Sequence, residues 1–116
     1  MVRIKRVYAP PAPEDGLRVL VDRLWPRGLT KEAAALDLWL KELGPSTELR
    51  KWFGHDPARW EAFSERYREE LESPERVAAL TRLRGLRDEQ GGVTLLFGAK
   101  EEAYNHAVLL AEVLKD

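Results

Sequence analysis

One short segment near the start of the chain combines side chains that can bind an anion and move a proton. It runs Asp22-Arg23-Leu24-Trp25-Pro26-Arg27-Gly28 and directly follows the apolar run 17–21. Guanidinium groups bind phosphate or carboxylate through paired hydrogen bonds, in a geometry that lysine cannot match. We therefore expect Arg23 and Arg27 to bind an anion beside a stacking ring from Trp25. Asp22 would orient an arginine or act as a base. The structural alternative is an ion pair between Asp22 and Arg23, with Trp25 in the core.

Three further candidate ligand-binding residues surround the end of a predicted helix, namely Arg50, Trp52 and His55. Trp52 lies beside a turn, which leaves its ring free to contact a ligand. A histidine near a helix C-terminus is also favoured by the helix dipole, so a purely structural role is the alternative for His55.

The last group of candidates lies near the C-terminus, where Lys100, Asn105 and His106 follow the apolar run 93–99. At helical spacing, His106 shares a face with the apolar positions of the final helix. We expect its imidazole to point under the end of the run 93–99 as a general base or ligand, or else to be a satisfied core histidine. Lys100 would supply a third cation there.

The composition is that of an ordinary globular chain. It has 116 residues, of which 44% are hydrophobic and 34% are charged. There is no cysteine, and the two histidines lack the spacing of a metal motif, so we expect no metal site and no cofactor. No signal-peptide core or membrane-length apolar run occurs, which predicts a cytoplasmic protein without a membrane partner. Abundant arginine and glutamate without cysteine suit a thermostable protein.

Charge is distributed unevenly along the chain. Residues 1–31 carry seven basic and three acidic side chains, a net charge of +4, so the remainder carries −5 of the total charge of −1. The basic end favours a small anionic molecule as partner, although solvated strand edges and ion pairs are the alternative explanation. The acidic remainder argues against a nucleic-acid partner.

Three segments have the pattern of β-strands. Residues 2–8 alternate apolar and basic side chains, whereas residues 17–21 and 93–99 are nearly continuous apolar runs. Such runs are typical of strands that are covered on both faces. The proline-rich stretch 9–16 predicts a stiff loop.

Five segments are predicted to be helices, over about residues 31–43, 47–53, 57–71, 74–89 and 101–114. Capping side chains precede the first four, at Thr30, Ser46, Asp56 and Ser73. The strands 17–21 and 93–99 are joined by a long helical crossover, which favours parallel pairing. Their carboxyl ends then share one edge, where the loops 22–28 and 98–100 face one crevice.

We therefore predict a single α/β domain over residues 1–116. It has a short, mainly parallel sheet of about three strands, flanked by about five helices.

Taken in order, these motifs resemble the YeaO-like family of small bacterial proteins over nearly the whole chain, from about residue 2 to 114. The resemblance rests on the segments 22–28 and 52–56, on Asp37-Leu38-Trp39 and on Asn105-His106-Ala107. It implies a compact α/β domain in the bacterial cytoplasm. The family signature falls on Asp22, Arg23, Trp25, Pro26, Arg27, Gly28, Arg50, Trp52, His55, Asn105 and His106. One departure is Gly98, where the family pattern has alanine, and we expect it to be harmless.

The resemblance carries no activity with it, so the function rests on the residues. They favour a binding site for a phosphate- or carboxylate-bearing molecule at the carboxyl edge of the strands. If the site belongs to a small enzyme, Asp22 or His106 moves the proton. The first alternative is a protein-interaction module with an Arg/Trp surface patch. The second is nucleic-acid binding through the basic first strand. The sequence leaves open whether His55 and His106 share a pocket.

Overall fold

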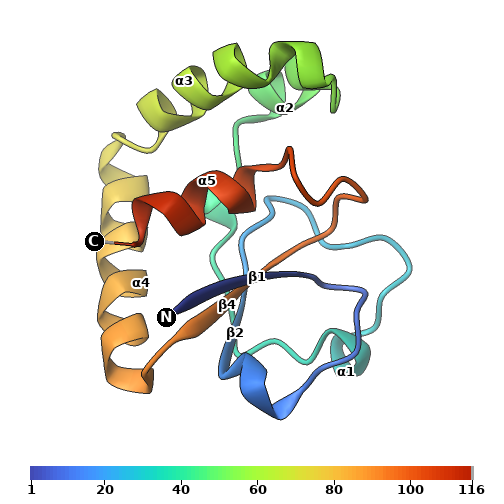
Figure 1. Cartoon of the computed structure of the whole chain (residues 1–116), viewed down its shortest axis with the longest axis vertical. Coiled ribbons are helices and arrows are strands. Elements are labelled where there is room, and N and C mark those ends of the chain that lie inside the picture. Colours follow the sequence, from blue (N-terminus) through green and yellow to red (C-terminus); the bar gives the residue numbers. More distant parts are fainter. Residues whose placement is uncertain (116) are drawn as a thin grey trace.

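Four parallel strands form the central sheet of the computed structural model, which describes residues 1–115 (Figure 1). They are β1 (Val2–Arg6), β2 (Leu17–Leu20), β3 (Leu38–Trp39) and β4 (Val93–Phe97), in the spatial order β1-β4-β2-β3. Leu95 of the central strand β4 lies opposite Ile4 of β1 and Val19 of β2. The predicted α/β class and the parallel pairing of β2 with β4 are confirmed, whereas the sheet has one strand more than predicted.

Helices cover the two faces of this sheet unequally. The larger core lies under α2 (Thr47–Phe53), α3 (Trp60–Glu70), α4 (Pro74–Gln90) and α5 (His106–Val113), which pack over the alternate positions Val19, Leu95 and Phe97. The other face carries only α1 (Lys31–Ala34) and its neighbouring loops, packed over Leu20 and Leu96. Because β4 is buried on both faces at all five positions, its sequence is a continuous apolar run. Three short 3-10 turns complete the chain, at Pro13–Asp15, Lys41–Leu43 and Pro57–Arg59.

The prediction of one helix over residues 31–43 is wrong. The helix ends at Ala34, Ala35 adopts a left-handed conformation with φ of 48°, and the edge strand β3 follows. The buried Arg18 side chain is the physical reason, since its Nη2 and Nε donate to the carbonyl oxygens of Ala34 and Ala35 at 2.8 and 3.0 Å. Ending the helix here leaves those carbonyls without intrahelical partners. The alternation of Leu36, Leu38 and Leu40 also fits a strand, and this signal was missed.

The last helix is shorter than the predicted span 101–114. It begins at His106 because Asn105 caps it, accepting hydrogen bonds from the amides of Ala107 and Val108 at 2.9 and 3.3 Å. Asn105 is itself buried, and its amide donates to the Glu101 carbonyl at 2.8 Å. The segment 101–104 is therefore a folded turn that leads into α5.

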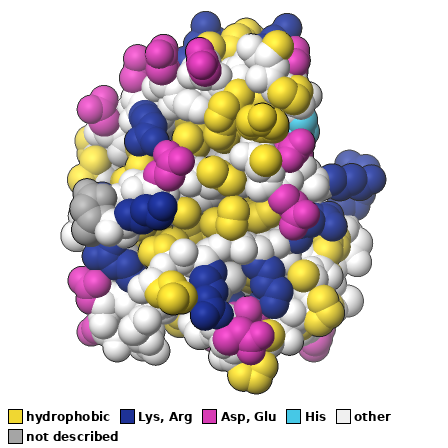
Figure 2. Space-filling model, in the orientation of Figure 1, with side chains coloured by type: hydrophobic (Ala, Val, Ile, Leu, Met, Phe, Trp, Pro, Cys, Tyr) yellow, Lys and Arg dark blue, Asp and Glu magenta, His cyan; other side chains and the backbone are white. Residues whose placement is uncertain are grey.

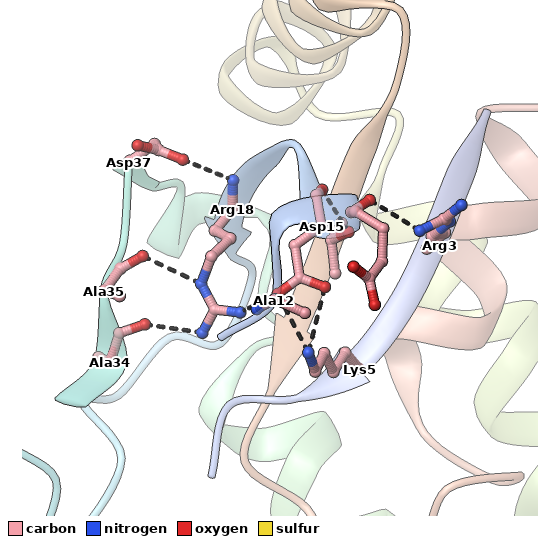
Figure 3. A network of polar contacts seen from close by, with 10 residues as sticks. Arg3, Lys5, Ala12, Asp15, Arg18, Ala34, Ala35 and Asp37 are labelled. Atoms are coloured by element: carbon pink, nitrogen blue, oxygen red, sulfur yellow. Dashed lines mark hydrogen bonds and ion pairs between the residues drawn. The ribbon is translucent and has the colours of Figure 1, made fainter. Parts of the chain in front are cut away.

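A buried polar network joins the amino-terminal ends of β2 and β4 to Lys5 of β1 (Figure 3). The Asp15 carboxylate accepts from Arg18 Nη1 at 2.5 Å, from Lys5 Nζ at 3.1 Å and from the Ala12 amide at 3.0 Å. The Thr94 hydroxyl donates to the Asp15 carbonyl at 2.6 Å. These bonds connect β1, β2 and β4 through one residue, Asp15, whose carboxylate binds Lys5 and Arg18 and whose carbonyl binds Thr94. Within residues 1–115, no helix has the length and apolar character needed to span a membrane.

The molecular face that carries α5 retains exposed apolar surface (Figure 2). Hydrophobic side chains gather over and around α5, with charged side chains between and beyond them. Ala111 and Val113 of α5 and Val2 and Ile4 of β1 pack against the larger core but remain partly exposed. Part of the apolar surface of α5 and of the edge strand β1 therefore stays open to solvent on this face.

Asp15 gives the fold a predictable acid sensitivity. Burial raises the pKa of this carboxyl, but the hydrogen bonds from the Ala12 amide, Lys5 and Arg18 outweigh burial and leave the pKa below its ordinary value. The network therefore stabilises the protein fully above the pKa that Asp15 has in the unfolded chain. It loses that contribution as pH falls through the lower pKa that Asp15 has in the folded protein.

We expect Asp15→Asn to lower the free energy of unfolding by about 3–5 kcal/mol at neutral pH, because Arg18 stays buried without its partner.

Urea unfolding at neutral and acid pH tests this expectation, with Glu14→Gln as the matched control, since the Glu14 side chain is exposed. Asp15→Asn should also flatten the acid branch of the stability profile. Equal stability of the two variants at neutral pH would contradict the assignment.

Candidate functional site

The candidate site lies at the carboxyl ends of β2 and β4, where the chain changes its winding direction. From β2 the chain passes to α1 on the smaller-core face and on to β3. From β4 it passes to α5, which packs on the other face over β1 and β4. Open α/β sheets bind ligands at such switch points, outside the carboxyl ends of the strands.

Asp22 ties the two strand ends together at this point. Its Oδ2 accepts a hydrogen bond from the Gly98 amide at 2.8 Å, and its carbonyl accepts from Trp39 Nε1 at 2.7 Å. A Cβ at position 98 would lie 3.0 Å from the same carboxylate oxygen, so glycine preserves space beside Asp22. The loops after β2 and β4 meet here, as the parallel pairing predicts.

His106, the first residue of α5, completes a pair with Asp22. Its Nε2 lies 2.9 Å from the Val21 carbonyl oxygen and 3.2 Å from Asp22 Oδ1. Because a carbonyl only accepts, Nε2 carries a hydrogen, and in the neutral ring Nδ1 keeps a lone pair. The hydrogen-bond geometry favours the carbonyl, which leaves the buried Asp22 Oδ1 without a bond of its own. The ring therefore reaches the exit of β2, beyond the β4 exit under which it was expected.

Arg23 is held against the backbone rather than by a carboxylate. Its Nε and Nη2 donate to the carbonyl oxygens of Pro45 and Gly44, both at 3.2 Å. The chain approaches so closely that a Cβ on Gly44 would lie 2.5 Å from the Arg23 amide nitrogen. No ion pair joins Arg23 to Asp22 within residues 1–115, so the structural alternative for this pair is not observed.

These groups line a cavity of about 250 Å³. Eight of the ten predicted site residues are among its lining residues: Asp22, Arg23, Trp25, Arg27, Arg50, His55, Asn105 and His106. The structure therefore places both histidines at one cavity, the point that the sequence left open. His55 reaches it in a left-handed conformation with φ of 57°, uncommon outside glycine, and its ring lies 5.9 Å from that of Phe53.

The cavity has an excess of positive charge. Arg23, Arg27 and Arg50 line it and, in the described part of the chain, form no ion pair, while Asp22 is the one carboxylate in the lining. Arg27 and Arg50 are exposed, so their guanidinium groups are open to a ligand from solvent. This arrangement is suited to binding an anion through charge-assisted hydrogen bonds.

Two predicted site residues lie elsewhere. Trp52 faces a different groove between α2 and α3, where the guanidinium of Arg66 lies 4.2 Å from its ring centroid and that of Arg59 at 5.2 Å. Lys100 is exposed and does not belong to the lining of the cavity. Trp25 combines both proposed roles, since it lines the cavity while its Nε1 donates to the Leu29 carbonyl at 2.7 Å.

Sequence reasoning missed several lining residues, above all Tyr8, Pro45, Phe53 and Phe63. The Tyr8 hydroxyl donates to the Arg27 carbonyl at 2.8 Å and so fastens the loop 22–28 over the end of β1. Tyr8 is the last residue of the predicted strand 2–8. Knowledge that this strand pairs in parallel with β4 would have placed Tyr8 at the same edge of the sheet as Gly98. Residues 1–115 contain no cluster of three His, Asp or Glu side chains that could hold a metal ion.

The close contact at Gly44 predicts a specific destabilisation. We expect Gly44→Ala to lower the free energy of unfolding by about 1–3 kcal/mol, because the backbone around Arg23 must shift. Gly85→Ala, within α4 and with nothing within 4 Å of an added Cβ, is the matched control. Alanine there should stabilise the protein by about 0.5–1 kcal/mol. Urea unfolding of both variants measures their free energies of unfolding. A Gly44→Ala variant as stable as the wild type would contradict the close approach of Gly44 to Arg23.

The His106 hydrogen bond predicts a nuclear magnetic resonance signature. At mildly alkaline pH, the Nε2 hydrogen of His106 should exchange slowly enough to give a signal in ¹H–¹⁵N spectra, since it is bonded and mostly buried. The exposed His55 should give no such signal and serves as the internal reference. A ring of His106 protonated at Nδ1 alone would contradict the geometry.

Comparisons with known proteins agree with the motifs. Residues 1–116 match the model of a family described as the inactive DUF488-N3 subclade. The uncharacterized protein YeaO of Escherichia coli K12 is 46% identical over 114 residues, which cover 98% of this chain and 96% of that protein. Uncharacterized proteins of Mycobacterium tuberculosis and Mycobacterium bovis are 42% identical over 113 residues, or 97% of this chain and 92% of theirs. No solved structure matches the chain significantly. The chain therefore belongs to the inactive DUF488-N3 subclade and, as its motifs indicate, to the YeaO-like proteins.

Proposed function

We propose that this protein binds a small molecule bearing a phosphate or carboxylate group in the cavity at the carboxyl ends of β2 and β4. The observation that carries the proposal is that three guanidinium groups without carboxylate partners line one cavity of about 250 Å³. Other arginines of this protein do have carboxylate partners, such as Arg18 with Asp15 and Arg68 with Glu112. The three arginines of the cavity share it with a single carboxylate, so an excess of positive charge remains that an anionic ligand can neutralise.

The three arginines would act differently. Arg23 is fixed by the carbonyls of Gly44 and Pro45, so it offers its remaining N–H groups from a preset position. Arg27 and Arg50 are exposed and come from different elements, one from the loop after β2 and the other from α2. They would close on the anion from solvent, each through two parallel hydrogen bonds.

The Asp22–His106 pair would add a polar contact beside the anion. With Nε2 bonded to the Val21 carbonyl, the neutral ring presents Nδ1 as an acceptor for a hydroxyl or a phosphate proton. The same pair could transfer a proton, and catalysis by Asp22 or His106 is the second form of the proposal. The family description of an inactive subclade favours binding without turnover.

The alternative functions have less support. The Trp rings that an interaction patch would need are engaged internally: Trp25 packs edge-on against Trp39 at 5.5 Å, and Trp52 lies beneath Arg66. In the basic first strand, Lys5 pairs with the buried Asp15 and Arg3 donates to the Glu14 carbonyl. Within residues 1–115, only Lys5 of that strand is neutralised by a carboxylate, but the net charge of −5 on residues 32–116 opposes binding to nucleic-acid phosphates.

A ligand screen by thermal shift tests the proposal, with phosphate, sugar phosphates and small carboxylates. A ligand at 100 times its dissociation constant adds about 2.7 kcal/mol of stability, enough to raise the melting temperature by several degrees. We expect Arg27→Ala and Arg50→Ala each to weaken binding about 10- to 100-fold, because each removes charge-assisted hydrogen bonds.

Arg82→Ala is the matched control, since Arg82 is an exposed arginine of α4 outside the cavity. It should bind as the wild type does. Equal losses in all three variants would show a general charge effect, and no shift with any anion would refute the proposed function.

A further inference from the structure

We infer that the ligand carries its anionic group on a single aromatic ring. The inference rests on the proposed function. It extends that proposal from the anionic group of the ligand to the rest of the ligand, here called its body. The arginines account for the anion, but most other lining side chains are apolar or aromatic, and a bare phosphate or sugar phosphate would leave them uncovered.

A row of aromatic rings lies beside the cavity, and two of its members, both phenylalanines, line it. Phe53 and Phe63 line it and are stacked at 4.2 Å between ring centroids. Phe63 stacks in turn on Tyr67 at 5.8 Å, and Tyr67 meets the His106 ring edge-on at 5.9 Å. The row thus runs from α2 to the Asp22–His106 pair. Aromatic rings prefer such offset and edge-on neighbours, so a ligand ring would find partners in the two phenylalanines that line the cavity.

Apolar side chains also stand at the outer side of the same cavity. Leu24 is 61% exposed and Tyr8 is 40% exposed, although both are large hydrophobic residues and both line the cavity. Tyr8 cannot turn away freely, because its hydroxyl is bonded to the Arg27 carbonyl and the Arg6 guanidinium lies over its ring at 5.1 Å. A flat apolar body bound against this rim would remove the exposed parts of Leu24 and Tyr8 from water. Phe53 and Phe63, which are only 4% and 2% exposed, would add van der Waals contact from the core side.

The volume limits the body to one ring. A cavity of about 150 Å³ accommodates benzene. The cavity of about 250 Å³ therefore has space for one ring together with a phosphate or carboxylate. Arg50 and Phe53 lie one turn apart on α2, so one face of that helix offers the anion contact and the ring contact together.

Matched ligand pairs measured by titration calorimetry on the whole protein test this inference. The pairs are phenyl phosphate with methyl phosphate and benzoate with acetate, and phenol is the ring without an anion. We expect the aryl member of at least one pair to bind about tenfold tighter than its methyl analogue, because the ring buries apolar surface. Phenol alone should bind far more weakly than the aryl anion.

A variant pair localises the effect. Leu24→Ser should reduce the preference for the aryl anion about threefold while leaving the affinity for the methyl analogue unchanged. Val77→Ser, at an apolar residue of α4 that is 47% exposed and outside the cavity, should change neither.

The failures of the two proposals are distinguishable. Equal affinity for aryl and methyl anions would overturn the ring inference and leave the anion site intact. Phenol binding as tightly as phenyl phosphate, or no anion binding at all, would instead overturn the proposed function on which the inference rests.

Discussion

The buried ion pair between Asp15 and Arg18 is the interaction on which the architecture depends. Both side chains are about 95% buried, and isolated burial of either charge would be strongly unfavourable. Their hydrogen bonds therefore have to be completed by the surrounding chain. Lys5 of β1, the Ala12 amide and the carbonyls of Ala34 and Ala35 supply them. The pair thus fixes where β1 and β2 lie and where α1 stops.

The end of α1 at Ala34 also affects the site at the carboxyl ends of the strands. Since α1 ends at Ala34, the chain has room to form β3 beside β2, and the turn after β3 brings Gly44 against Arg23. Gly44 and Pro45 then hold the guanidinium that faces the cavity. The connection from β2 to β3 therefore links the Asp15–Arg18 network to the position of Arg23.

The two edges treat their charges in opposite ways. At the amino edge, the buried carboxylate is matched by two cations and a backbone amide. At the carboxyl edge, three arginines share a cavity with one carboxylate, and one oxygen of that carboxylate has no hydrogen bond. Charged and polar groups that have no partner within the protein are expected where it binds a ligand. The contrast within one sheet is the main physical support for a ligand site at the second edge.

The sequence by itself determined the α/β class, the parallel pairing of β2 with β4 and the meeting of Asp22 with the loop after β4. These follow from apolar runs and from one long crossover, which are local properties of the chain. It did not determine the end of α1 at Ala34, because that depends on Arg18, sixteen residues away, taking the helix carbonyls as acceptors. The sequence also did not show that His55 and His106 line one cavity while Trp52 faces another groove. The packing of α2 and α3 beside α5 decides both placements. Local pattern fixes the elements, whereas partners distant in sequence fix where the elements end and which side chains meet.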